Sequence, residues 1–212
     1  MSKSIILTSD ETNFLNPQMG FFIPGFIPSL PRNKIPKGIR YLLEKYMFYK
    51  IPHKNGEVYQ CIYGLRKIEA ILLDAKFDCK IISPQVIEQY ADDAAVFGVY
   101  SMDPLGIGPV TATLQGVFGD PRYNVLGNDQ YYDPPYTHLK FKALIERLQK
   151  FNKPIIVGGS GASQFDSFPE AQNELGIDHL IIGDVEEEAA KIFNKLLKGE
   201  KLPKVIHCGH LP

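Results

Sequence analysis

Residues 63–83 read YGLRKIEAILLDAKFDCKIIS, and this stretch combines the two patterns that decide the fold. In its first part, apolar residues recur every three or four positions with charged residues between them, which predicts an amphipathic helix over residues 63–76. The apolar run at residues 79–83 follows at once and predicts a buried strand. A helix that leads directly into a buried strand is the βαβ rhythm of a parallel sheet.

The same alternation extends through most of the chain. Short apolar runs predict five strands, at residues 4–8, 79–83, 95–100, 155–157 and 179–182. Helical periodicity predicts helices at residues 37–49, 63–76, 86–92, 137–151, 168–175 and 185–198. The last of these has three acids in its first turn and lysines in its last turn, which matches the helix dipole. The sequence therefore predicts an α/β fold with a doubly wound, five-stranded parallel sheet.

Residues 11–60 form a long insertion between the first strand and the first long helix. Four prolines between residues 20 and 36 disfavour regular structure there. Loops of this length inside a compact domain are usually functional. The insertion carries nine aromatic residues: Phe14, Phe21, Phe22, Phe26, Tyr41, Tyr46, Phe48, Tyr49 and Tyr59. We expect it either to cover the ligand edge of the sheet as a lid or to pack against a further domain.

The composition excludes several classes of function. The chain of 212 residues has 23 basic and 24 acidic side chains, so no excess of charge favours nucleic acid or an anionic membrane as a partner. It has no run of 18 apolar residues, and its N-terminus lacks the length of a signal peptide, so we expect a cytoplasmic protein. Cys61, Cys79 and Cys208 are too widely spaced for a disulfide framework or a metal cluster. Whether residues 207–210 (HCGH) bind a metal stays open.

Small and polar residues follow four of the predicted strands. Ligands of open parallel sheets bind outside the carboxyl ends of the strands, so these residues are the candidate binding site. They are Ser9 and Asp10 after the first strand, Ser101, Met102 and Asp103 after the third, Gly158, Gly159 and Ser160 after the fourth, and Gly183, Asp184, Val185 and Glu186 after the fifth. Glycines at this edge let a ligand approach the backbone, because they have no Cβ.

Each group of residues also has a purely structural interpretation. The role of Gly158 and Gly159 could be limited to the turn between a strand and a helix. Ser101 with Asp103 could form a helix cap. Asp184 with Glu186 could be acids placed at a helix N-terminus. The glycines of residues 158–161 (GGSG) lack the spacing and the position of the dinucleotide fingerprint, which argues against a nicotinamide cofactor.

The order of these features resembles the N-terminal cobalamin-binding domains of radical S-adenosylmethionine proteins. The matching residues are YGLRK at 63–67, FGVYS at 97–101, VGG at 157–159 and IIGDVE at 181–186, and the matching pieces extend from about residue 4 to 212. The last run is similar to the Gly-Glu-Gly-Glu stretch of that family, with Asp184 and Val185 at its second and third positions. The resemblance adds Tyr63 and Gly64 to the cofactor-binding candidates and implies a flavodoxin-like or Rossmann-like cobalamin-binding fold.

The resemblance also implies how cobalamin would be bound. Better-known cobalamin domains have a D-x-H-x-x-G loop after the first strand, whose histidine binds cobalt. Here Asp10 begins that loop, Thr12 stands at the histidine position and Leu15 at the glycine position. The resemblance therefore implies base-off cobalamin without a histidine ligand, the nucleotide tail beside Ser101, Gly158 and Gly159, and a role in methyl transfer.

The resemblance implies that the chain is one module of a larger enzyme. The C-x-x-x-C-x-x-C motif that holds a 4Fe-4S cluster does not occur in the sequence. S-adenosylmethionine and the cluster would therefore belong to a radical SAM catalytic domain, joined through residues 204–212 as a linker after a domain at 1–203. Two other functions stay open: a flavodoxin-like domain that binds a flavin or nucleotide, and a degenerate domain that serves as an interaction scaffold.

Overall fold

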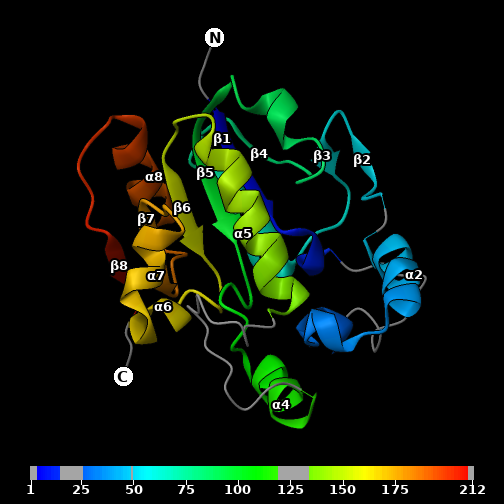
Figure 1. Cartoon of the computed structure of the whole chain (residues 1–212). Helices are drawn as coiled ribbons and strands as arrows, with labels where there is room; N and C mark the ends of the chain where they lie inside the picture. Colours follow the sequence, from blue (N-terminus) through cyan, green and yellow to red (C-terminus); the bar gives the residue numbers. More distant parts are fainter. Residues whose placement is uncertain (1–3, 15–25, 49, 119–133, 210–212) are drawn as a thin grey trace.

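The computed structural model describes residues 4–14, 26–48, 50–118 and 134–209. At its centre six parallel strands lie in the order β4-β1-β5-β6-β7-β8 (Figure 1). Their bounds are β1 (Ser4–Ser9), β4 (Cys79–Ile81), β5 (Ala94–Tyr100), β6 (Ile155–Gly158), β7 (His179–Gly183) and β8 (Val205–Cys208). Strand order reverses at β1, because β4 lies on one side of it and β5 on the other. In folds of this kind the reversal opens a crevice at the carboxyl edge.

The predicted α/β class with a parallel sheet is confirmed, but the predicted number of strands is wrong. The sixth strand, β8, pairs with β7 from Leu180↔Val205 to Gly183↔Cys208, within residues expected to be a linker. Its four residues (VIHC) include the polar His207 and are mostly half-buried or exposed, and they pair only with β7, at the edge of the sheet. That residues 204–212 lead into a catalytic domain stays a prediction.

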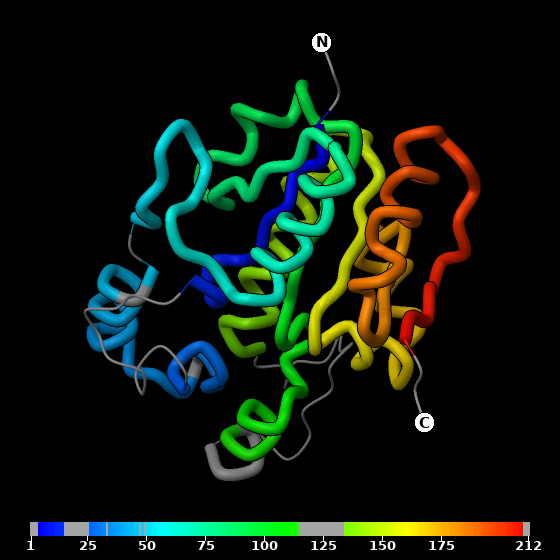
Figure 2. The backbone as a smooth tube through the Cα atoms, turned by 180° about the vertical axis from the view of Figure 1, so that it is seen from behind, coloured from blue at the N-terminus to red at the C-terminus, as the bar shows by residue number. Residues whose placement is uncertain are grey.

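Helices cover both faces of the sheet. One face carries α5 (Tyr136–Gln149), α6 (Gln164–Ser167) and α7 (Pro169–Glu174), whose apolar side chains pack in one core with Phe97 and Val157 (Figure 1). The other face carries α3 (Tyr63–Asp74) and α8 (Ala189–Leu197), seen from their side in Figure 2. Leu7, Leu72 and Phe193 belong to this second core. The sheet is therefore buried on both sides, which fits its nearly continuous apolar strands.

The helices predicted at residues 37–49, 63–76, 137–151 and 168–175 are confirmed, and two other predictions need correction. The helix expected at residues 86–92 is a 3₁₀ turn, Ile87–Tyr90. The helix expected at residues 185–198 begins only at Ala189, so Glu186 and Glu187 precede it and its first turn holds no acid. Glu188 is the N-cap residue, so of the three acids it alone adjoins the helix N-terminus.

The insertion and one unpredicted helix lie outside the layers. The described part of residues 11–60 contains three 3₁₀ turns, Glu11–Asn13, Ile27–Ser29 and Arg32–Lys34, together with α2 (Lys37–Met47) and the small hairpin β2 (His53–Lys54) and β3 (Glu57–Val58). The unpredicted helix α4 (Pro109–Phe118) lies beyond the carboxyl ends of β5 and β6 (Figure 1). Within the described ranges, no helix combines the length and the apolar character needed to cross a bilayer.

Candidate functional site

Three hollows open at the carboxyl edge of the sheet in the described part of the chain, and one of them, of about 800 Å³, is a charged surface hollow lined by Lys67, Asp184, Glu186, Glu187, Glu188, Lys191 and Gly209. The other two adjoin the end of β5. The first, which we call the edge cavity, has a volume of about 530 Å³. Its walls come from the loops after β1 and β5, the start of α3, the start of α4 and the turn at Ile27–Ser29 of the insertion. The second, which we call the glycine slot, has a volume of about 70 Å³ and lies between the sheet and helices α3 and α8.

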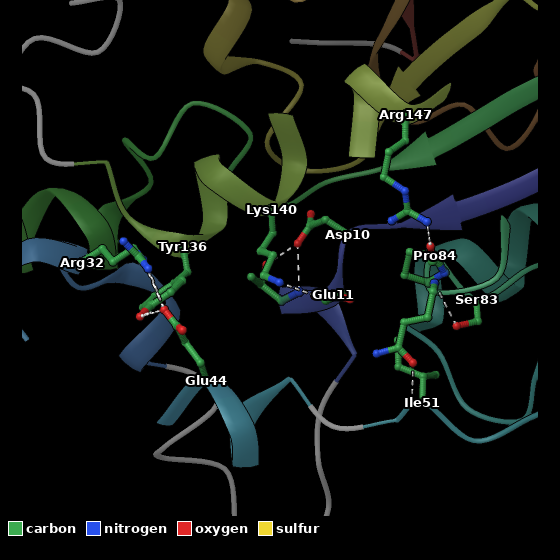
Figure 3. Close-up of polar contacts among 12 residues, drawn as sticks. Asp10, Glu11, Arg32, Glu44, Ile51, Ser83, Pro84, Tyr136, Lys140 and Arg147 are labelled. Carbon is green, nitrogen blue, oxygen red and sulfur yellow. Dashed lines mark hydrogen bonds and ion pairs between the residues drawn. The ribbon is translucent and has the colours of Figure 1, made fainter. Parts of the chain in front are cut away.

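A buried carboxyl group lies in the wall of the edge cavity. Asp10 is only 2% exposed and accepts hydrogen bonds from the Thr12 amide at 2.9 Å, the Thr12 hydroxyl and Asn13 Nδ2 at 2.7 Å. Burial raises the pKa of Asp10 from 3.8 to about 6, although these hydrogen bonds favour the charged form. Beside it, Lys140 Nζ of α5 lies 2.6 Å from Glu11 Oε2, which fixes the loop after β1 to α5 (Figure 3).

A second carboxylate organises the loop after β5. Asp103 accepts hydrogen bonds from the amides of Ile107 at 2.8 Å and Gly108 at 2.7 Å. It also accepts three side-chain hydrogen bonds, from Thr111, Thr137 and Gln164. These donors come from α4, α5, α6 and the loop itself. Asp103 therefore holds the wall of the edge cavity in place, which is more than a simple helix cap.

The remaining predicted residues near this cavity divide into buried and exposed groups. Ser9 is buried and donates a hydrogen bond to the Tyr100 carbonyl at 2.7 Å, so it joins β1 to β5. Tyr63 and Met102 line the cavity and are 79% and 54% exposed. Two large, exposed apolar groups at the rim of a hollow are available to cover a ligand.

The glycine slot is apolar and is created by missing side chains. Gly98 of β5 and Gly158 of β6 both line it, and so do Leu7 and Phe193 from the core on that face. At Gly158 the nearest atom to an added Cβ would be 3.8 Å away, at Ile181, so a Cβ would make an ordinary van der Waals contact there without a clash. At Gly98 an added Cβ would come within 2.5 Å of Leu7 Cδ2. A side chain at Gly158 would therefore extend into the slot, whereas the Leu7 side chain already occupies the position next to Gly98.

The two adjacent glycines, Gly158 and Gly159, have different roles. Gly159 has φ +101°, and an added Cβ would lie 2.7 Å from the Ser101 carbonyl oxygen. Its lack of a side chain is therefore needed for the turn itself. Ser101 is buried here, and its backbone donates to the Gly158 carbonyl at 3.0 Å and accepts from the Gly161 amide at 3.1 Å. Ser160 is exposed in the same turn.

The residues after β7 lie at the other end of the slot. Gly183 has φ +98° and lines the slot together with Val185. Asp184 is exposed. Glu186 Oε1 lies 2.6 Å from Lys67 Nζ, an ion pair that joins the loop after β7 to α3.

Most of the predicted site residues line one of the two hollows beside β5. Asp10, Thr12, Tyr63, Met102 and Asp103 line the edge cavity, and Gly158, Gly159, Gly183 and Val185 line the slot. Asp184 and Glu186 instead line the charged surface hollow. Four predicted residues lie outside these linings: Ser9, Gly64, Ser101 and Ser160.

Sequence reasoning missed Gly98 and Tyr100, which both line the slot. A glycine inside a strand is a signal for close approach of another group, so Gly98 could have been found. Tyr100 gives no such signal, because an aromatic residue in a strand is ordinary.

No group of three or more metal-binding side chains occurs in the described part of the chain. Cys208 is buried in β8, and burial raises the pKa of its thiol to about 11. His210 lies outside the described residues. None of the histidines in the described ranges lines the edge cavity. His138, the nearest to the loop after β5, lies with Nδ1 2.9 Å from the Pro104 carbonyl oxygen.

Comparison with known proteins gives similarity of structure only. The sequence matches no protein-family model and no curated protein sequence. A structure of TsrM, a radical S-adenosylmethionine methyltransferase from Kitasatospora setae with cobalamin and a [4Fe-4S] cluster bound, is similar over 95% of this chain, with a TM-score of 0.50 and 14% identity. A second TsrM structure, with tryptophan and a SAM analogue bound, is similar over 94% of this chain, with a TM-score of 0.47 and 13% identity. This chain spans about a quarter of that enzyme's length, 26% and 27%.

Proposed function

We propose that this chain is a cobalamin-binding module of a radical S-adenosylmethionine enzyme. The observation that carries the proposal is the pair of hollows at the carboxyl edge: a roomy cavity of about 530 Å³ beside an apolar slot walled by glycines. Cobalamin is a large cofactor with a broad corrin ring and a separate, flat nucleotide base. In the proposal the ring lies over the edge cavity and the base enters the slot.

The residues present fit this cofactor in three respects. Gly158 leaves room on one face of the sheet that a side chain would fill. Tyr63 and Met102 offer exposed apolar surface at the rim of the edge cavity. Asp10 and Asp103 are already hydrogen-bonded within the protein, so the wall of that cavity is preorganised.

The cofactor supplies the cobalt chemistry when it is bound, and this chain supplies binding, orientation and exclusion of water. The base-off form without a histidine ligand follows from Thr12 at the expected histidine position, and no described histidine lines the cavity. Methyl transfer is the proposed role of the complete enzyme. S-adenosylmethionine and the iron–sulfur cluster would be bound by a catalytic domain outside this sequence, which has no C-x-x-x-C-x-x-C motif.

Titration with hydroxocobalamin, followed by visible absorption, tests the proposal. We expect a bound, base-off spectrum that is unchanged when each of the five histidines is replaced in turn by alanine. A spectrum with a nitrogen ligand that disappears in one of these variants would contradict the base-off form. Absence of binding would favour the interaction scaffold, and quenching of flavin mononucleotide fluorescence would favour the flavin alternative.

A further inference from the structure

The glycine slot is too small for a flat bicyclic base in the structure. Its volume is about 70 Å³, whereas an apolar cavity of roughly 150 Å³ takes a single benzene ring. The slot must therefore widen before a base of two fused rings can enter. The walls formed by the strands and by Phe193 are buried core, whereas Ile68, Tyr100 and Val185 pack against that core from partly buried positions, so the widening has to come from one of these three.

The Tyr100 ring lies at the mouth of the slot. Tyr100 is the last residue of β5, two positions after Gly98, so both residues face the same side of the sheet. In the register of the sheet it pairs with Gly158. Its ring also lies against Gly64 at the start of α3 and against Gly159, where added Cβ atoms would come within 3.2 and 2.9 Å of ring carbons.

The position of this ring among glycines makes it the part of the slot that can move. Gly64, Gly158 and Gly159 have no side chains that could interlock with the ring. Tyr100 is half-buried at a strand end, between the slot and the carboxyl edge. Rotation about its side-chain torsions can therefore carry the ring out of the slot without a change in the sheet.

We propose that Tyr100 is the gate of the glycine slot: its ring closes the mouth in the free protein and must swing aside to admit a flat aromatic group. This inference rests on the proposed function. It makes Tyr100 the residue that discriminates between corrinoids with and without a nucleotide base, because only the former need the slot to open.

The first test uses benzimidazole alone and does not depend on binding of a corrinoid. Amide NMR titration is carried out on the parent, Tyr100→Ala, Tyr100→Leu and Tyr100→Phe, with Tyr41→Ala as a control for an exposed tyrosine on α2. We expect Tyr100→Ala and Tyr100→Leu to bind benzimidazole at least tenfold more tightly than the parent, with shifts in α3 and α8. Tyr100→Phe and Tyr41→Ala should match the parent. If the parent, Tyr100→Ala and Tyr100→Leu bind benzimidazole equally tightly, the proposed role of Tyr100 as a gate is wrong.

The second test compares the association rates of hydroxocobalamin and of cobinamide, which lacks the nucleotide. Tyr100→Ala should accelerate association of hydroxocobalamin at least tenfold and leave that of cobinamide within twofold. An equal change for both ligands overturns the gate, since Tyr100 would then act on the corrin ring. If the parent binds neither corrinoid, the proposed function fails, and the benzimidazole titration still decides the role of Tyr100.

Discussion

The glycine slot and the edge cavity share one edge of the sheet but are built in opposite ways. Strands and long helices form the slot, its walls are apolar, and four of its residues are glycines: Gly98, Gly158, Gly159 and Gly183. Loops form most of the edge cavity, and the carboxylates of Asp10 and Asp103 hold those loops through hydrogen bonds. The shape of the slot therefore depends on which side chains are missing, and the shape of the cavity depends on a few polar groups that are present.

This difference predicts different responses to substitution. Loss of one carboxylate should loosen the edge cavity and lower stability, because buried donors lose their acceptor. Addition of a side chain in the slot should block a ligand with little effect on folding, provided that the backbone can accept it. The following predictions test this contrast, from the largest expected effect on stability to the smallest.

Substitution of Asp103 should have the largest effect. Asp103→Ala removes the acceptor of two backbone amides and of three side chains. We expect the free energy of unfolding to fall by roughly 3–5 kcal/mol, because each deprived donor costs about 1 kcal/mol. Urea denaturation measures the loss, and hydrogen exchange should show it first in α4. Asp103→Asn is the matched control and should recover part of the stability, since its amide oxygen still accepts hydrogen bonds. A loss below about 1 kcal/mol would show that the loop does not depend on this carboxylate.

The sequence predicted most of the fold because its periodic patterns are strong. The helix over residues 63–76 and the strand after it both form where their apolar spacing indicates. Among the missed elements were the short α6 and the hairpin β2 and β3, as well as α4 and β8, and the last two have a clear physical reason. The helix α4 (PVTATLQGVF) contains β-branched residues and a glycine, which have low helix propensity, and β8 is stabilised by its pairing with β7 and not by a pattern of its own.

The candidate site could be predicted in position but not in detail. The carboxyl ends of the strands follow from topology, and nine of the predicted residues line one of the two hollows. Which glycine leaves open space and which only permits a turn depends on atoms from other strands. Gly158 faces Ile181 of β7, while Gly159 faces the backbone of Ser101. The residues next to a glycine in the sequence give no information about contacts with other strands.

The edge cavity should respond to pH through Asp10, and the slot should not. Burial raises the pKa of Asp10 to about 6 in the folded protein, above its ordinary value of 3.8. The protonated carboxyl group of Asp10 thus makes its full contribution to the free energy of unfolding below about pH 4. This contribution is lost as the pH rises through about 6. The free energy of unfolding of the parent, relative to Asp10→Asn, should fall by roughly 3 kcal/mol between pH 4 and pH 7.5.

The measurement for Asp10 is a series of urea denaturations of both proteins across that pH range. Asp10→Asn also weakens the hydrogen bonds from Thr12 and Asn13, but this loss is the same at every pH. The pH dependence of the difference therefore reports the carboxyl group alone. A difference that stays constant from pH 4 to pH 7.5 would mean that Asp10 is already ionised at the acid end.

The two adjacent glycines at the end of β6 give the most discriminating prediction, because one substitution changes the fold and the other changes the ligand. Gly159→Val places a Cβ 2.7 Å from the Ser101 carbonyl oxygen at a φ of +101°, so the free energy of unfolding should fall by roughly 2–3 kcal/mol. At Gly158 an added Cβ has its nearest neighbour at 3.8 Å, and the residue has a strand conformation that valine favours, so we expect Gly158→Val to cost less than about 1 kcal/mol.

Gly158→Val should nevertheless weaken cobalamin binding at least tenfold, since its side chain enters the slot that the nucleotide base needs. Binding of cobinamide should change by less than twofold, because that ligand has no base to place there. Thermal unfolding and absorption titration on the same samples separate the two effects. If Gly158→Val folds like the parent and binds both corrinoids equally well, the base lies elsewhere. The slot would then be a packing defect between β6 and the helices α3 and α8, and the edge cavity alone would have to hold the cofactor.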